Sequence, residues 1–203
     1  MASELRAVMV DFGALEKAFR KRDEAVVDEL DDEHWTALFE FGGEDEDEDE
    51  EDGAYDEEEL AAMRAQAAAL LGGRPVEEEP VWEDAFYGLC VHFGDVLHNE
   101  LFDRVNVDYI VELDRAIAEL TELEPGFLQK LVFQSRVPLA LPPPSDGIIL
   151  GFVPAEAVEE LDEVLQAHHL DLGDRETTAA AVQLREWLHA AAMFEQSLVL
   201  YYF

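Results

Sequence analysis

The residues best suited to chemistry gather in one short segment, where Cys90, His92, Asp95 and His98 offer the sulfur, nitrogen and oxygen ligands that a metal ion needs. Zinc sites normally show two paired ligand spacings, whereas Cys90 and His92 are separated by a single residue. On a helix, this spacing points the two side chains to different faces. We therefore predict a buried thiol beside histidines at a helix end, with no metal and no cofactor.

A ligand pocket is another use for the same region. Trp82, Tyr87, His92 and His98 combine aromatic surface with titratable nitrogens, which is a common lining for a small-molecule site. These four residues are the candidate pocket of a small enzyme or ligand-binding domain. We keep this function as the alternative hypothesis.

Nucleophilic catalysis has less support in the sequence. It requires a serine or cysteine near a histidine and an acid, usually on a strained turn, and Ser135, Ser145 and Ser197 have no such setting. The pair His168 and His169 stands where a helix should end, so we expect it to cap that helix. We therefore name no catalytic residue and expect a protein that is not an enzyme.

Residues 44–52 form an uninterrupted acidic run, EDEDEDEED. Like charges at this density repel one another in any regular element, so we predict a solvated, disordered, low-complexity loop over residues 44–59. The run also matches an EF-hand register, with Glu48, Glu50, Asp52, Gly53, Asp56 and Glu59 at the calcium-loop positions. Because any dense acidic run matches the carboxylate positions, only Gly53 is informative, and we predict no specific calcium site.

The charge of the whole chain limits its partners. The 203 residues include 49 acidic and 13 basic side chains, a formal net charge of -36. Such a surface repels nucleic-acid phosphates and anionic lipids, so we predict that neither nucleic acid nor a membrane is a partner. The single cysteine cannot form an internal disulfide, and no segment resembles a signal peptide or a membrane span, which favours the cytoplasm.

The spacing of apolar residues predicts the secondary structure. Strands are expected at residues 4–11, 128–134 and 147–153 and in the C-terminal SLVLYYF, since these segments are apolar and rich in β-formers. Helical periodicity predicts helices at residues 14–22, 23–41, 56–71, 81–93, 105–120 and 175–195, with a further helix opening at Pro154. The fold class is therefore α+β: a small mixed β-sheet packed with about six helices, in one domain over residues 1–203.

Three short sequence segments resemble the YfbM-like family of small bacterial proteins of unknown function. They are Trp82-Glu83-Asp84-Ala85-Phe86-Tyr87-Gly88-Leu89, then Gly151-Phe152-Val153-Pro154 leading into Glu156, and finally Leu188 with Ala190-Ala191-Ala192 before Leu198-Val199-Leu200-Tyr201-Tyr202. The resemblance covers about the C-terminal three-fifths of the chain and includes no catalytic signature. It implies an α+β fold, and the occurrence of some relatives near toxin and immunity genes implies an immunity-type role by association.

These observations favour a non-enzymatic protein–protein interaction module, of the immunity type, that binds a basic protein such as a cationic toxin. The acidic surface would steer and hold the partner by charge complementarity. The predicted partner-binding residues form the acidic run: Glu44, Asp45, Glu46, Asp47, Glu48, Asp49, Glu50, Glu51 and Asp52.

Overall fold

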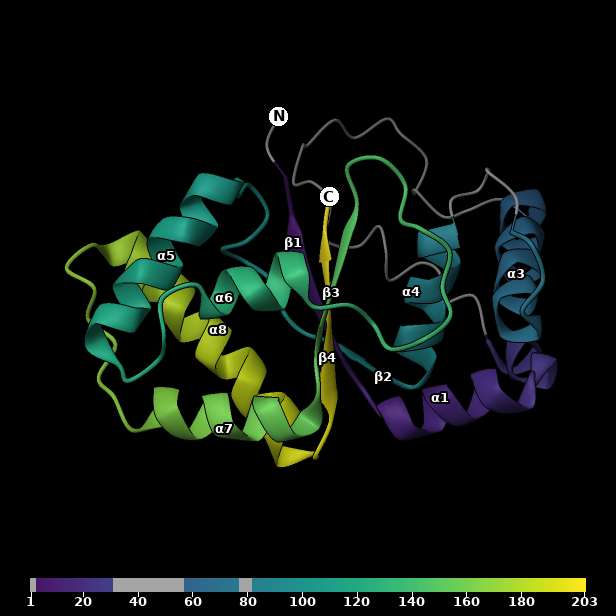
Figure 1. The fold of residues 1–203 in the computed structure, drawn as a ribbon. Helices are drawn as coiled ribbons and strands as arrows, with labels where there is room; N and C mark the ends of the chain where they lie inside the picture. Colours follow the sequence, from purple (N-terminus) through teal and green to yellow (C-terminus); the bar gives the residue numbers. More distant parts are fainter. Residues whose placement is uncertain (1–2, 31–56, 77–81) are drawn as a thin grey trace. The chain divides into compact units, whose positions relative to one another are not determined.

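The computed structural model of the chain describes residues 3–30, 57–76 and 82–203, and within them it has the predicted α+β class (Figure 1). The strands are β1 (Leu5–Val10), β2 (Gly94–Val96), β3 (Ile149–Val153) and β4 (Ser197–Tyr202). The α-helices are α1 (Phe12–Lys21), α3 (Glu57–Gly72), α4 (Trp82–His92), α5 (Val107–Leu120), α6 (Phe127–Gln129), α7 (Ala155–Gln166) and α8 (Arg175–Met193). A 3₁₀ helix, η1 (Glu24–Glu29), and a π-helical turn, η2 (Lys130–Gln134), complete the described elements.

The sheet has the strand order β2-β1-β4-β3, so the C-terminal strand lies inside it. β4 pairs antiparallel with β1, from Leu5 opposite Tyr202 to Val10 opposite Ser197, and antiparallel with β3 on its other edge. The predicted mixed sheet is therefore corrected to an antiparallel one. β1 and β3 run in the same direction, but β4 separates them, so they form no parallel pair.

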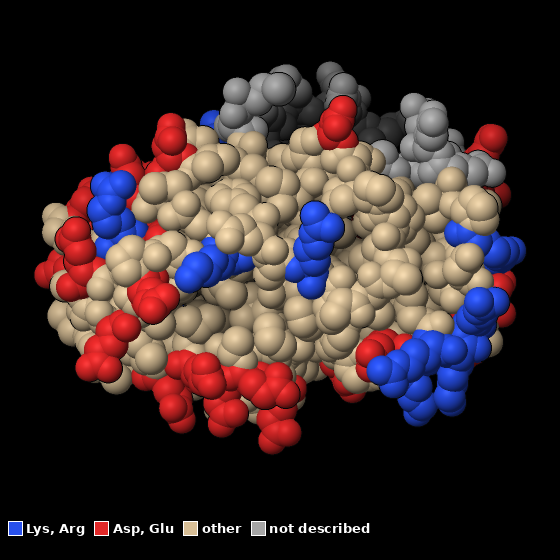
Figure 2. All heavy atoms as spheres, viewed as in Figure 1, with Lys and Arg blue, Asp and Glu red and all other residues tan. Residues whose placement is uncertain are grey.

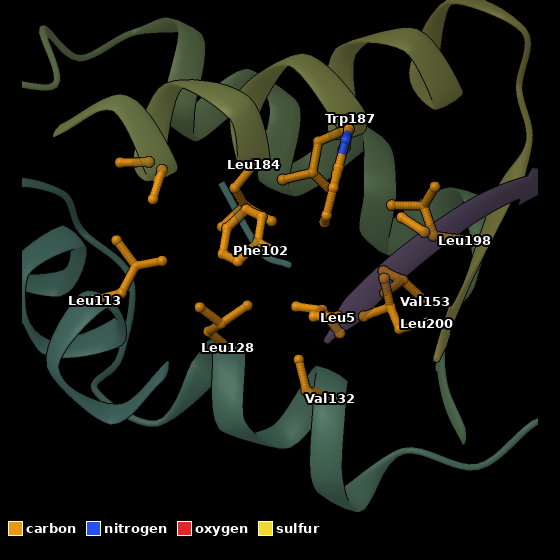
Figure 3. Close-up of a cluster of buried hydrophobic side chains, with 14 of the residues drawn as sticks. Leu5, Phe102, Leu113, Leu128, Val132, Val153, Leu184, Trp187, Leu198 and Leu200 are labelled. Atoms are coloured by element: carbon orange, nitrogen blue, oxygen red, sulfur yellow. The ribbon is translucent and has the colours of Figure 1, made fainter. Parts of the chain in front are cut away.

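The chain forms two compact units. The first consists of residues 1–12, 95–138 and 146–203 and holds most of the sheet together with α5 to α8. Its core lies between α8, α5, the α6–η2 segment and one face of the sheet (Figure 3), with Leu5, Leu128, Leu184 and Leu198 among its buried side chains. Phe102 packs against Trp187, with 4.9 Å between ring centroids. The second unit consists of residues 13–94 and 139–145.

Residues 128–134 form a helical segment, which corrects the predicted strand. Asp114 of α5, only 1% exposed, accepts hydrogen bonds from the backbone N–H groups of Gly126 (2.5 Å) and Leu128 (2.8 Å). These are the first donors of α6, which have no partner inside the helix, so Asp114 caps it from outside the segment. The apolar spacing of LQKLVFQ suits either a strand or a short helix, and a residue remote in sequence decides between them.

The second unit is built around α4, and buried polar contacts attach residues 139–145 to it. The indole N–H of Trp82 donates to the carbonyl oxygen of Pro143 at 3.3 Å. Glu83, 2% exposed, accepts from the backbone N–H of Ser145 at 2.5 Å and from its hydroxyl at 3.2 Å. The proline-rich segment therefore has a fixed position on this helix.

Most other predicted elements agree with the structure. Within the predicted helix at residues 23–41, the described part is the 3₁₀ helix η1, and residues 31–41 lie outside the described ranges. Of the predicted acidic loop at residues 44–59, only Glu57–Glu59 are described, and they form the first turn of α3 rather than a loop. Acidic residues are favourable in that position because the N-terminus of a helix carries partial positive charge. Across the described ranges, no helix is both long and apolar enough to cross a membrane.

Candidate interaction surface

The predicted partner-binding run, Glu44 to Asp52, lies outside the residues that the structure describes, so its contribution stays a prediction. The described residues nevertheless contain a second concentration of acid, on helix α7. This helix has Glu156, Glu159, Glu160, Asp162 and Glu163 among its 12 residues and includes neither lysine nor arginine. Four of these side chains, all except Asp162, are exposed. In Figure 2, carboxylates cover the edge of the first unit where Figure 1 places α7.

The exposed acids of α7 fall at spacings of three and four residues, which places them on neighbouring parts of one helix surface. Glu156 and Glu160, and likewise Glu159 and Glu163, are pairs of like charge at the four-residue spacing. Each such pair destabilises an isolated helix by about 0.2–0.5 kcal/mol. A basic partner would relieve this repulsion because it places positive charge between the carboxylates.

Asp162, the remaining acid of α7, has a local partner. Its Oδ2 lies 3.1 Å from Nδ1 of His189 on α8, a contact that is ionic when the histidine is protonated. His168, at the C-terminal end of α7, donates from Nδ1 to the carbonyl oxygen of Val164 at 2.8 Å. This bond confirms that His168 caps the helix, as its position in the sequence predicted.

The candidate pocket residues point in different directions. Trp82, Tyr87 and His92 all lie on α4, and each five-residue step turns the side chain by about 140° around the helix, so the three cannot face one site. Trp82 and Tyr87 are 4% and 1% exposed, which leaves them as core residues of the second unit. His98 lies in the first unit, is exposed, and pairs through Nε2 with Glu100 at 2.8 Å.

Cys90 is fully buried on α4, in agreement with the prediction of a buried thiol. Within the described ranges, no three His, Cys, Asp or Glu side chains are grouped so that they could hold a metal ion. His92 approaches Glu29 of the same unit, with 3.8 Å between Nε2 and Oε2. Cys90 and His92 therefore have structural surroundings on α4 and do not converge on one metal site.

Sequence reasoning did not select Glu83 and Asp84, two adjacent carboxylates of α4, because acidic residues are so frequent in the chain. Glu83 uses both oxygens to hold Ser145, so it positions a loop. Burial, and then the charge of Glu83, raise the pKa of Asp84 to about 6. A perturbed carboxyl group is a common feature of active sites, but buried ion and hydrogen-bond networks produce the same shift. We interpret Glu83 as part of the attachment of residues 139–145 and its charge as one cause of the raised pKa of Asp84.

The sequence pattern also failed to single out Met193 and Phe194, at the C-terminal end of α8. Their side chains are 68% and 67% exposed, the two most exposed large apolar side chains of the described residues. The pattern predicts a helix over residues 175–195 that runs into an apolar strand, and it assigns neither residue to a buried or an exposed position. Their exposure places an apolar pair on the surface of the unit that carries α7.

A family model described as "Domain of unknown function (DUF7691)" matches residues 1–203. Neither the curated proteins nor the solved structures include a match. The resemblance to the YfbM-like family therefore stays a prediction that these comparisons do not test.

Proposed function

The chain belongs to the DUF7691 family, whose function is unknown, and we propose that it is a non-enzymatic interaction protein that binds a basic protein through its acidic surface. The observation that carries this proposal is the outer surface of α7, where exposed glutamates occur without a lysine or arginine in the helix. The proposal includes an immunity-type role, in which the bound partner is a cationic toxin, and action in the cytoplasm.

The physical basis is long-range attraction followed by close charge pairing. A net charge of -36 attracts a cationic protein before contact and raises the association rate, an effect that salt screens over a distance of about 8–10 Å. At contact, charge complementarity also disfavours partners whose contacting surface is negatively charged. The acidic run at residues 44–52 would add to the attraction, while the glutamates of α7 have fixed positions on a folded element and would contribute to orientation.

A capture experiment with purified wild-type protein tests the proposal. We expect the chain to retain a basic protein from a cell extract at about 50 mM salt and to release it at about 500 mM salt. The partner should also bind the wild type in a purified two-component assay. Failure to bind any cationic protein, or binding that does not change with salt, would contradict the proposal.

Two variants separate the contributions of the acidic segments. The α7 variant changes Glu159, Glu160 and Glu163 to Gln; its matched control changes Asp108 of α5 to Asn and Glu112 and Glu119 to Gln, which removes the same formal charge from another exposed helix. We expect a larger loss of affinity from the α7 variant than from the control. Deletion of residues 44–52 tests the acidic run in the same assay. Unchanged binding would indicate that the run contributes to solubility and not to partner binding.

A further inference from the structure

The exposed pair Met193 and Phe194 forms an apolar site at the C-terminal end of α8. A single exposed apolar residue needs no explanation, but two adjacent large ones, each about two-thirds exposed, are costly to leave in water. Phenylalanine and methionine are also among the residues enriched at protein–protein interfaces. The pair is therefore the part of this surface best suited to anchor a partner.

The backbone holds this pair in a fixed position. The N–H of Gln196 donates to the carbonyl oxygen of Ala191 (2.9 Å), and the N–H of Glu195 donates to that of Ala192 (3.0 Å). These two bonds form a Schellman motif, in which Glu195 takes the left-handed position with φ 55°. Met193 and Phe194 are the last residues before that turn, so little backbone freedom is lost when a partner covers them.

The acidic surface of α7 lies beside the pair. α7 begins just after β3 and α8 ends just before β4, and Val153 of β3 pairs with Leu198 of β4, so the start of α7 and the end of α8 lie at the same end of these two strands (Figure 1). The contact between Asp162 and His189 shows that the two helices pack side by side. His189 precedes Met193 by about one helical turn.

The charges around the pair select its partner. Glu195 follows the pair directly, and the exposed glutamates of α7 lie on the neighbouring helix, whereas the nearest groups on α8 that can carry positive charge are His189, which contacts Asp162, and Arg185, about two turns before Met193. A second copy of this acidic chain, or an anionic membrane, would be repelled at this surface. A basic segment would be attracted.

We propose that Met193 and Phe194, together with the glutamates of α7, bind a basic protein segment that presents an apolar side chain, such as one face of a cationic amphipathic helix. This inference rests on the proposed function and assigns its docking surface. The apolar side chain covers Met193 and Phe194, while lysine or arginine side chains on either side of it pair with the glutamates.

Two synthetic peptides test the assignment by calorimetry. The first is an amphipathic helix of lysine and leucine; the second has the same length and charge, with serine in place of leucine. We expect the wild-type chain to bind the leucine peptide about tenfold more tightly than the serine peptide, because one large apolar side chain is buried in the contact. The Met193→Ser/Phe194→Ser variant should lose this preference and keep its affinity for the serine peptide.

A control variant, Val107→Ser/Leu120→Ser, removes two other exposed apolar side chains, on α5, and should keep the preference for the leucine peptide. If the Met193→Ser/Phe194→Ser variant also keeps it, the docking surface is wrong while the proposed function stands. If the wild-type chain binds neither peptide in a salt-dependent way, the proposed function fails as well. If sedimentation shows that the wild type self-associates and the Met193/Phe194 variant does not, the occupant is a second copy and the inference is overturned.

Discussion

Gly151 of β3 occupies a site where a larger residue cannot fit, and its replacement by alanine gives a sharp test of the packing. A Cβ atom at this position would overlap the carbonyl oxygen of Leu131 and would lie 3.0 Å from that of Val132, both in the π-helical turn η2. Backbone atoms cannot rotate away as side-chain ends do. The alanine would therefore force β3 and η2 apart, although pairing with β4 fixes the position of β3.

Two contributions determine how much Gly151→Ala lowers the free energy of unfolding. Overpacking of a dense core costs about 1–3 kcal/mol. Separation also weakens the hydrogen bonds that join η2 to β3, in which the N–H of Phe152 donates to the hydroxyl of Ser135 (2.8 Å), and Ser135 donates to the carbonyl oxygen of Leu131. Loss of one such bond costs about 1 kcal/mol. Since alanine is favoured over glycine in a strand by about 0.5–1 kcal/mol, these terms together give a net destabilisation of about 1–3.5 kcal/mol.

Urea denaturation followed by circular dichroism measures this effect as a lower midpoint at an unchanged slope. The matched control is Gly72→Ala at the end of α3, where the Cβ would meet side-chain ends, Glu24 Oε1 at 2.8 Å and Arg74 Nε at 2.9 Å, which can move. We expect the control to change the free energy of unfolding by less than about 1 kcal/mol, because it disturbs only an exposed ion pair. A Gly151→Ala variant as stable as the wild type would refute the reasoning.

Three further predictions concern polar groups and one backbone turn. Asp114→Asn should lower the free energy of unfolding by about 2–3 kcal/mol, because an amide NH₂ group would face a backbone donor of α6; a urea midpoint equal to that of the wild type would contradict this. Burial raises the folded-state pKa of Asp84 from its ordinary value of 3.8 to about 6, so the folded state binds the proton more tightly and the contribution of Asp84 to stability falls as the pH rises from about 4 to about 6. Asp84→Asn should remove that fall, and parallel stability–pH curves for variant and wild type would argue against it. Glu195→Gly should raise the free energy of unfolding by about 0.5–1 kcal/mol, and with it the thermal midpoint, because glycine adopts the left-handed conformation without steric cost. A lower midpoint would show that the Glu195 side chain stabilises the turn.

The sequence predicted the elements whose periodicity is long and regular. β1, α5, α7, α8 and β4 all lie within or close to the predicted ranges, because each buries a continuous stripe or face. β2 was missed: it has three residues, too few to show a period. The segment at residues 128–134 was assigned to the wrong class because its helical start depends on Asp114, which lies in another helix.

The candidate surface was only partly predictable. The excess of acid was evident from composition, but neither the burial of Asp114 and Glu83 nor the exposure of Glu159 and Glu163 could be read from a chain with so many carboxylates. The exposure of Phe194 depends on where α8 ends and on how the chain turns into β4. That turn is made by a glutamate in a conformation typical of glycine, so no residue type marked it.

Hydrogen–deuterium exchange of the wild-type chain, with and without the lysine–leucine peptide, locates the contact without any substitution. We expect the peptide to slow exchange at the start of α7 and at the turn around Glu195, and to leave α5 unchanged. Protection spread evenly over all acidic helices, or confined to segments far from α7 and α8, would show that charge alone attracts the peptide and that this surface is not the binding site.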